Sequence, residues 1–290
     1  MTFVDAARRG ESRPELDQTE VMAKSATENF TVASRFLPRD VRRHFLAIYG
    51  YARFVDDVGD RVGGDRDRQL DWVEAEIDRG LAGTSSHPVF SAVGATAREL
   101  GIDRSPFADL LAANRQDQVV DRYETYAALE RYCSLSANPV GRVVLAVLGR
   151  SDELACELSD RICTGLQLVE HWQDVGEDYR AGRVYLPLED LRRFSVEEPE
   201  LGGTLAGREL RRLVSFETGR ARDLILSGLP LVRLLSGAGR VAVAGFAGGG
   251  LAQVDAIGRA RFDVLARPVK ATRSAMLSRS LAVLAGRAGR

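Results

Sequence analysis

The stretch LACELSDRICTGLQLV, residues 154–169, decides the fold class. Its apolar side chains recur every three or four positions, at Leu154, Leu158, Ile162, Leu166 and Val169. This spacing places the apolar side chains on one face of an α-helix. The stretch therefore predicts a helix that packs in the core of the protein.

Helical spacing extends from this stretch over most of the chain. Upstream it recurs at Val41, Phe45, Ile48, Ala52 and Val55, and strict period-two alternation over a strand length is hard to find. Helix breakers fall at residues 63–64, 80–88, 101–106, 182–187, 199–207 and 237–239. We predict eight to ten helices in a single all-α domain over residues 21–290, preceded by a flexible arm over residues 1–20.

Composition narrows the class of protein. The 290 residues are 45% hydrophobic and 28% charged, which is typical of a globular protein. The net charge of −1 argues against a nucleic-acid partner. The three cysteines include no CxxC pair, which favours a reducing, cytoplasmic location. The longest apolar run, residues 241–252, is about half of the ~20 residues that span a bilayer, so we expect a soluble protein that could still contact a membrane surface.

The first candidate metal site is an acidic helix face. Asp56 and Asp60 are four residues apart, on a helix expected to begin near residues 38–40, so their carboxylates share one face. Tyr49 and Arg53 precede them on the same stripe. A divalent cation between the carboxylates would relieve their repulsion. The alternative is a solvated acidic helix end.

The second candidate site follows the core helix. Glu170, Asp174 and Asp178 are again spaced by four, and Gln167 lies seven residues before Asp174. All-carboxylate ligation favours Mg²⁺ first and Mn²⁺ second. A di-iron centre would need Glu-x-x-His pairs on two helices, which the sequence lacks. The three histidines (His44, His87 and His171) lack metal-ligand spacing and are interpreted as satisfied or solvated side chains.

Magnesium held by opposed aspartates, with arginines nearby, implies a diphosphate substrate. The candidate cations are Arg53, Arg122 and Arg183. A glycine-rich phosphate loop is absent, which disfavours a nucleotide.

The two aspartate motifs, in this order and separation, resemble the squalene and phytoene synthase family. The resemblance covers roughly residues 25–280. It is carried by Tyr49, Arg53, Asp56, Asp60, Asp117, Arg122, Tyr123, Tyr132, Cys133, Val140, Gly141, Gln167, Asp174, Asp178 and residues 183–187. It implies an isoprenoid-synthase-like helical bundle with a central apolar cavity and a prenyl diphosphate substrate.

Finer features resemble the bacterial hydroxysqualene synthase branch, namely residues 28–38, 132–142 and 171–175. Synthases that condense two prenyl diphosphates usually carry Lys-Ser-Phe near residue 28 and an arginine just before the second motif. This chain has Glu28-Asn29 at the first of these places and Gln173 at the second, so it lacks both of the cationic side chains. It also has Glu170 where the branch has asparagine, and Phe262 where the family often has tyrosine.

The branch implies Mg²⁺-dependent conversion of presqualene diphosphate to hydroxysqualene in bacterial squalene and hopanoid biosynthesis, without NADPH. The four aspartates would hold the metal, and Tyr132 would face the carbocation. Asn138, beside a kink expected at Pro139, would place the water that captures it. The expected substrate-binding residues are Tyr49, Arg53, Gln167, Glu170 and Arg183.

Two other functions remain open at this point. One is head-to-head condensation of two farnesyl diphosphates, or a phytoene-synthase-like reaction. The other is a non-catalytic prenyl-lipid binding protein, which would predict damaged aspartate motifs, whereas all four aspartates are intact. Further expected partners are a membrane surface and other enzymes of the squalene pathway. The small residues of 241–252 would either leave room for prenyl tails or allow close helix packing at Gly245-x-x-x-Gly249.

Overall fold

The computed structural model describes residues 38–60 and 65–289, and the arm predicted over residues 1–20 lies outside them. The described residues form thirteen α-helices, one 3-10 helix and no strand, which confirms the all-α class. The helix count exceeds the prediction because several short helices divide the connections. The elements are α3 (Arg39–Asp60), α4 (Arg66–Ala82), α5 (Pro88–Leu100), α6 (Ser105–Gln116), α7 (Tyr126–Ser136), α8 (Asn138–Val147), α9 (Glu153–Gln173), α10 (Val175–Arg180), α11 (Leu188–Phe194), η1 (Glu198–Gly202), α12 (Arg208–Gly228), α13 (Leu231–Leu234), α14 (Gly237–Arg259) and α15 (Arg273–Leu284).

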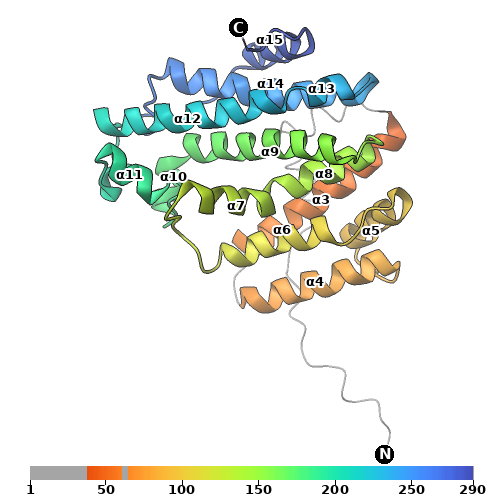
Figure 1. The fold of residues 1–290 in the computed structure, drawn as a ribbon. Coiled ribbons are helices and arrows are strands. Elements are labelled where there is room, and N and C mark those ends of the chain that lie inside the picture. The colour runs from red at the N-terminus through yellow and green to blue at the C-terminus, as the bar shows by residue number, and fades with distance from the viewer. Residues whose placement is uncertain (1–37, 61–64, 290) are drawn as a thin grey trace, which may run out of the picture.

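The helices stack in layers (Figure 1). Helix α9 packs against α12 on one side and against α7 and α8 on the other. Helix α14 lies beyond α12 and carries α15 on its outer side, while α4 and α5 pair at the opposite end of the bundle. Three apolar clusters fill the interior of the described residues: one around α9, α12 and α14, one around α3 to α6, and a smaller one between α3, α8 and α14.

Glycines set the close approach of α9 and α12. A Cβ atom on Gly165 would lie 2.9 Å from the backbone oxygen of Ala221, and one on Gly228 would lie 2.6 Å from that of Leu158. Helix α9 begins where the Asp152 side chain accepts a hydrogen bond from the Ala155 N–H group. Leu154 was expected on the apolar face but is exposed, since it lies in this first turn.

The small residues of α14 serve close packing. A Cβ atom on Gly248 would lie 2.5 Å from Cα of Ser280 in α15, and one on Gly250 would lie 2.3 Å from Leu166 in α9. The close helix contacts are therefore made by Gly248 and Gly250, and not by the expected pair Gly245 and Gly249. A Cβ atom on Gly245 would meet nothing within 4 Å, and one on Gly249 would make only an ordinary van der Waals contact. Among the described residues, α14 alone is long and apolar enough to span a membrane, but 61% of its apolar window is buried inside the protein.

A buried acidic pair joins α11 to α12. Glu217 is fully buried, and Arg220 Nη1 donates hydrogen bonds to Glu217 Oε1 at 3.1 Å and to Asp190 Oδ2 at 2.7 Å. Arg220 faces both carboxyl groups, and Arg193 Nη1 also lies 3.7 Å from Asp190 Oδ1. Burial is the main reason that the pKa of Glu217 is raised to about 8.

Glu217 predicts a pH-dependent stability. Its pKa is raised on folding from 4.5, so the folded state holds an extra proton between pH 4.5 and pH 8. The free energy of unfolding should therefore fall as the pH rises through this window, by up to about 1.4 kcal/mol per pH unit. Glu217→Gln mimics the protonated form and should flatten this dependence in urea unfolding. Parallel curves for the variant and the wild type would rule out the assignment.

Candidate functional site

The first aspartate motif lies on the last two turns of α3. Asp56 is exposed, whereas its neighbour Asp57 is buried and its Oδ1 accepts a hydrogen bond from Arg53 Nη2 at 3.0 Å. Arg53, expected to face the substrate, is thus held by a carboxylate that the sequence analysis did not single out. Tyr49 is buried on the same helix. Asp60 is the last residue of α3, and its side chain is outside the described part of the chain.

Helix α6 is fitted against this motif. Asn114 Nδ2 donates a hydrogen bond to Asp56 Oδ1 at 3.4 Å, and Gln118 Nε2 donates to the Gly59 carbonyl at 3.3 Å. A Cβ atom on Gly59 would lie 2.3 Å from Asn114 Oδ1, so any larger residue there would displace the Asn114 side chain. Asn114 was not predicted as a site residue, and its spacing of four from Gln118 is a weak signal in the sequence.

Gly59→Ala should disturb this contact specifically. The added methyl group must push the Asn114 amide away from Asp56, and we expect kcat/KM to fall about tenfold because Asp56 loses its positioning. Gly219→Ala in α12 is the matched control, since nothing lies within 4 Å of its Cβ position. Steady-state kinetics and thermal unfolding of both variants test this. Equal kcat/KM values for the two would show that Asn114 has no positioning role.

Tyr132 connects α6 to α7. Its hydroxyl donates a hydrogen bond to Asp117 Oδ2 at 2.8 Å, and Asp117 caps the C-terminus of α6, one turn beyond Asn114. Burial, with the nearby Tyr185 and Asp117, raises the pKa of Tyr132 far above its ordinary value. The phenol is therefore neutral, and its hydrogen bond fixes the orientation of the ring.

Three other rings gather around Tyr132. His171 stacks on Tyr185 with ring centres 3.7 Å apart, and Tyr132 lies 5.4 Å from Tyr123 and 6.0 Å from Tyr185. Burial, and then the charge of Arg183, lowers the pKa of His171 to about 3. His171 is therefore neutral, and one of its ring nitrogens lies 3.2 Å from Gln167 Nε2. We call Tyr123, Tyr132, His171 and Tyr185 the aromatic group.

The second aspartate motif lies at a break between two helices. Helix α9 ends at Gln173, Asp174 leaves helical geometry, and α10 begins at Val175. The spacing of four in the second motif therefore spans a helix break and not one continuous helix. The spacing of one turn survives, because Asp174 N–H bonds to the Glu170 carbonyl at 3.0 Å and Asp178 N–H bonds to the Asp174 carbonyl at 2.8 Å.

The partial burial of the Asp174 carboxylate disfavours its charged form. Its burial raises the pKa of the carboxyl group, while a 2.8 Å hydrogen bond from Gln173 Nε2 and the charge of Lys270 act in the opposite direction. Lys270 was not anticipated, because it lies about a hundred residues away in the sequence. A bound cation would stabilise the charged carboxylate against this burial. Glu170, by contrast, is exposed.

Arg122 has a structural role. It donates hydrogen bonds to Glu198 Oε1 at 2.7 Å and to the Gly182 carbonyl at 2.6 Å, so it is not available in this form as a diphosphate ligand. Arg122 and Val184 also form an isolated bridge, with Val184 N–H bonded to the Asp121 carbonyl at 2.8 Å. These bonds hold the segment with Arg183 and Tyr185 in place, so that Tyr185 packs against the other three rings of the aromatic group.

Asn138 begins α8 after α7 has ended at Ser136. Pro139 lies in the first turn of α8, where it starts a new helix, so the expected kink is a complete break between two helices. Asn138 is buried, and its Oδ1 accepts a hydrogen bond from Thr164 Oγ1 in α9 at 3.0 Å. The amide thus has a fixed position near the middle of α9.

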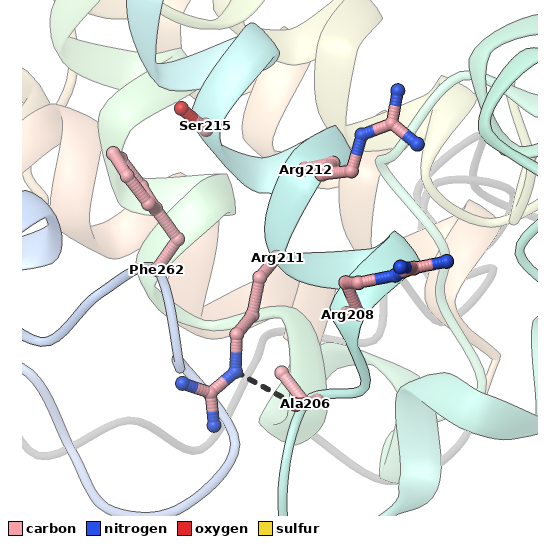
Figure 2. Close-up of a pocket in the computed structure, with 6 residues that line it drawn as sticks. All are labelled: Ala206, Arg208, Arg211, Arg212, Ser215 and Phe262. Atoms are coloured by element: carbon pink, nitrogen blue, oxygen red, sulfur yellow. Dashed lines mark hydrogen bonds between the residues drawn. The ribbon is translucent and has the colours of Figure 1, made fainter.

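A pocket of about 580 Å³ lies apart from these residues (Figure 2). It is lined by Ala206, Arg208, Arg211, Arg212, Ser215 and Phe262. The lining residues of α12 are on the face opposite its buried leucines, so this pocket is not the expected central cavity. Phe262, which replaces the tyrosine expected from the family, lines this outer pocket.

The carboxylates suit a hard divalent ion by their chemistry, since every candidate donor is oxygen. Within residues 38–60 and 65–289, no three His, Cys, Asp or Glu side chains are grouped closely enough to hold a metal. The Asp60 side chain falls outside that search, and the metal site stays a prediction. Helix α6 contacts the first motif through Asn114 and Asp56. Through Asp117 and Tyr132 it also reaches the ring of His171, which lies three residues before Asp174.

Comparison with solved structures supports the fold. The chain is 37% identical in sequence to the squalene synthase HpnC from Alicyclobacillus acidocaldarius, whose crystal structure it matches with a TM-score of 0.79 over 84% of this chain and 93% of that one. The fold is thus that of a helical isoprenoid synthase.

Sequence comparison identifies the family. Residues 23–275 match the family described as squalene/phytoene synthase. A hydroxysqualene synthase from Zymomonas mobilis is 36% identical over 68% of this chain and 67% of its own length. A 15-cis-phytoene synthase from Synechocystis is 32% identical over 67% of this chain and 62% of its own length. The chain belongs to the squalene/phytoene synthase family.

Proposed function

We propose that this protein converts presqualene diphosphate to hydroxysqualene and diphosphate in the cytoplasm, with Mg²⁺ as cofactor. Hydroxysqualene synthases among its relatives support the branch. Gln173 also supports this branch, because its neutral amide donates a hydrogen bond to Asp174. An enzyme that binds two prenyl diphosphates at once would gain from a cationic side chain at this position.

The neutral aromatic group is the observation that carries the proposal. When the carbon–oxygen bond of the substrate breaks, its electron pair leaves with the diphosphate and a carbocation remains. Ring faces stabilise a cation without trapping it covalently. A protonated histidine would repel the cation, so the low pKa of His171 suits this role. Water then adds to the cation and loses a proton to form the alcohol.

Asp56, Asp60, Asp174 and Asp178 would hold the metal. When bound, Mg²⁺ would neutralise the charge that develops on the leaving diphosphate. The half-buried Asp174, whose pKa burial raises, is the residue that gains most from a cation. Arg183 lies close enough to lower the pKa of His171 and would contact the same diphosphate.

Asn138 would position the water. Asn138→Ala should raise the proportion of hydrocarbon or rearranged products relative to the alcohol, since an unplaced water captures the cation less often. Thr164→Val, which removes the hydrogen bond that fixes the amide, should shift products the same way but less. Product analysis by gas chromatography tests both, and an unchanged product ratio at normal turnover would exclude this role.

The substrate is tested by incubating the purified protein separately with farnesyl diphosphate and presqualene diphosphate, with and without NADPH. We expect presqualene diphosphate alone to give the alcohol. Condensation of farnesyl diphosphate would instead support the alternative, which the phytoene synthases among the relatives keep open.

A further inference from the structure

Among the described residues, helix α15 leaves one face exposed. It packs against α14, where Arg279 pairs with Asp255 at 2.6 Å and Ser280 lies against Gly248. Figure 1 shows it as the outermost helix at that end of the bundle. Its opposite side carries Leu277 and Leu281, which are 62% and 57% exposed.

The exposed residues form a stripe. Arg273, Leu277 and Leu281 follow one another at intervals of four, so they lie on one side of the helix. Val241 is 47% exposed and follows Arg240, whose guanidinium donates a hydrogen bond to the Leu284 carbonyl at the end of α15. Three of the six large exposed apolar side chains in the described residues thus belong to α14 and α15.

The charged residues of the segment that carries this stripe are all basic, although Arg279 is paired with Asp255 of α14. Residues 264–290 contain six basic residues and no acidic residue, in a chain whose net charge is −1. Arg273 begins α15 and Arg287 follows its end, and both are exposed. Arg233 reaches the same end, with Nη2 3.3 Å from the Cβ position of Gly286.

We propose that α15 docks this protein onto an anionic lipid bilayer, with Leu277 and Leu281 in the interface and the arginines on the headgroups. Exposed leucines on a helix surrounded by basic residues suit insertion to the depth of the headgroups, because burial of the leucines and attraction of the arginines act together. A segment with basic residues and no acidic residue matches a uniformly anionic surface better than a protein partner of mixed charge. This surface is independent of the reaction proposed above.

The test is flotation of the full-length protein with vesicles of phosphatidylglycerol and phosphatidylcholine, and with vesicles of phosphatidylcholine alone. We expect binding to the anionic vesicles that is at least tenfold stronger and that weakens between 50 and 500 mM salt. L277S/L281S should lower this binding at least tenfold. L154S/L205S, which also replaces two exposed leucines, should bind like the wild type.

A second variant, R273E/R287E, should also lower binding to the anionic vesicles while its circular dichroism spectrum is unchanged. The proposal is overturned if the wild type does not float, or if L277S/L281S floats as well as L154S/L205S. It is also overturned if light scattering shows a dimer that L277S/L281S dissociates, because the face would then bind a second copy of the chain.

Discussion

Asp174→Asn is expected to lower kcat for diphosphate release by about a thousandfold while the protein remains folded. The substitution keeps the shape of the side chain and removes the charge that would hold the cation. It also removes a carboxylate whose pKa burial already raises, so folding should not suffer. Release of diphosphate from presqualene diphosphate, measured at saturating Mg²⁺, tests this.

Glu177→Gln is the matched control for Asp174→Asn. Glu177 lies on α10 next to Asp178, but it is exposed, and the same loss of charge there should change kcat less than threefold. If Asp174→Asn retained activity within tenfold of Glu177→Gln, Asp174 would not be a metal ligand.

Gly94→Ala should have the largest effect on stability. A Cβ atom there would lie 2.0 Å from the backbone oxygen of Gly80, and neither helix backbone can move without separating α4 from α5. We expect the free energy of unfolding to fall by ~3 kcal/mol, as in overpacked cores. Urea unfolding followed by circular dichroism measures the change.

Gly245→Ala in α14 is the opposing case. Its Cβ position has no atom within 4 Å, so alanine adds helix propensity without a clash and should raise the free energy of unfolding by about 1 kcal/mol. If Gly94→Ala proved as stable as Gly245→Ala, the close approach of α4 and α5 would be wrong.

The sequence predicted the helical class because apolar periodicity is a local property. Helix α9 follows from the spacing of Leu158, Ile162 and Leu166. Helix count was underestimated because short helices such as α13, with four residues, are too short to show a period. The close contacts of Gly94 with Gly80 depend on tertiary packing, which a lone glycine in a sequence does not reveal.

The acidic residues of the candidate site could be predicted from the sequence, but the side chains that contact them could not. Two adjacent aspartates on α3 look equivalent in sequence, yet Asp57 is buried on Arg53 and Asp56 is exposed. Asn114 and Lys270 come from distant segments and carry no motif. His171 was interpreted as an ordinary satisfied side chain, and its stacking on Tyr185 required the fold to bring a loop over α9.

The central claim is that aspartates from α3 and from the α9–α10 junction together hold divalent metal with diphosphate. Mn²⁺ binding in the presence of inorganic diphosphate, followed by electron paramagnetic resonance, tests it most directly. We predict that D56N/D60N and D174N/D178N each abolish the diphosphate-dependent Mn²⁺ signal that the wild type gives. Wild-type binding by either double variant would contradict the claim.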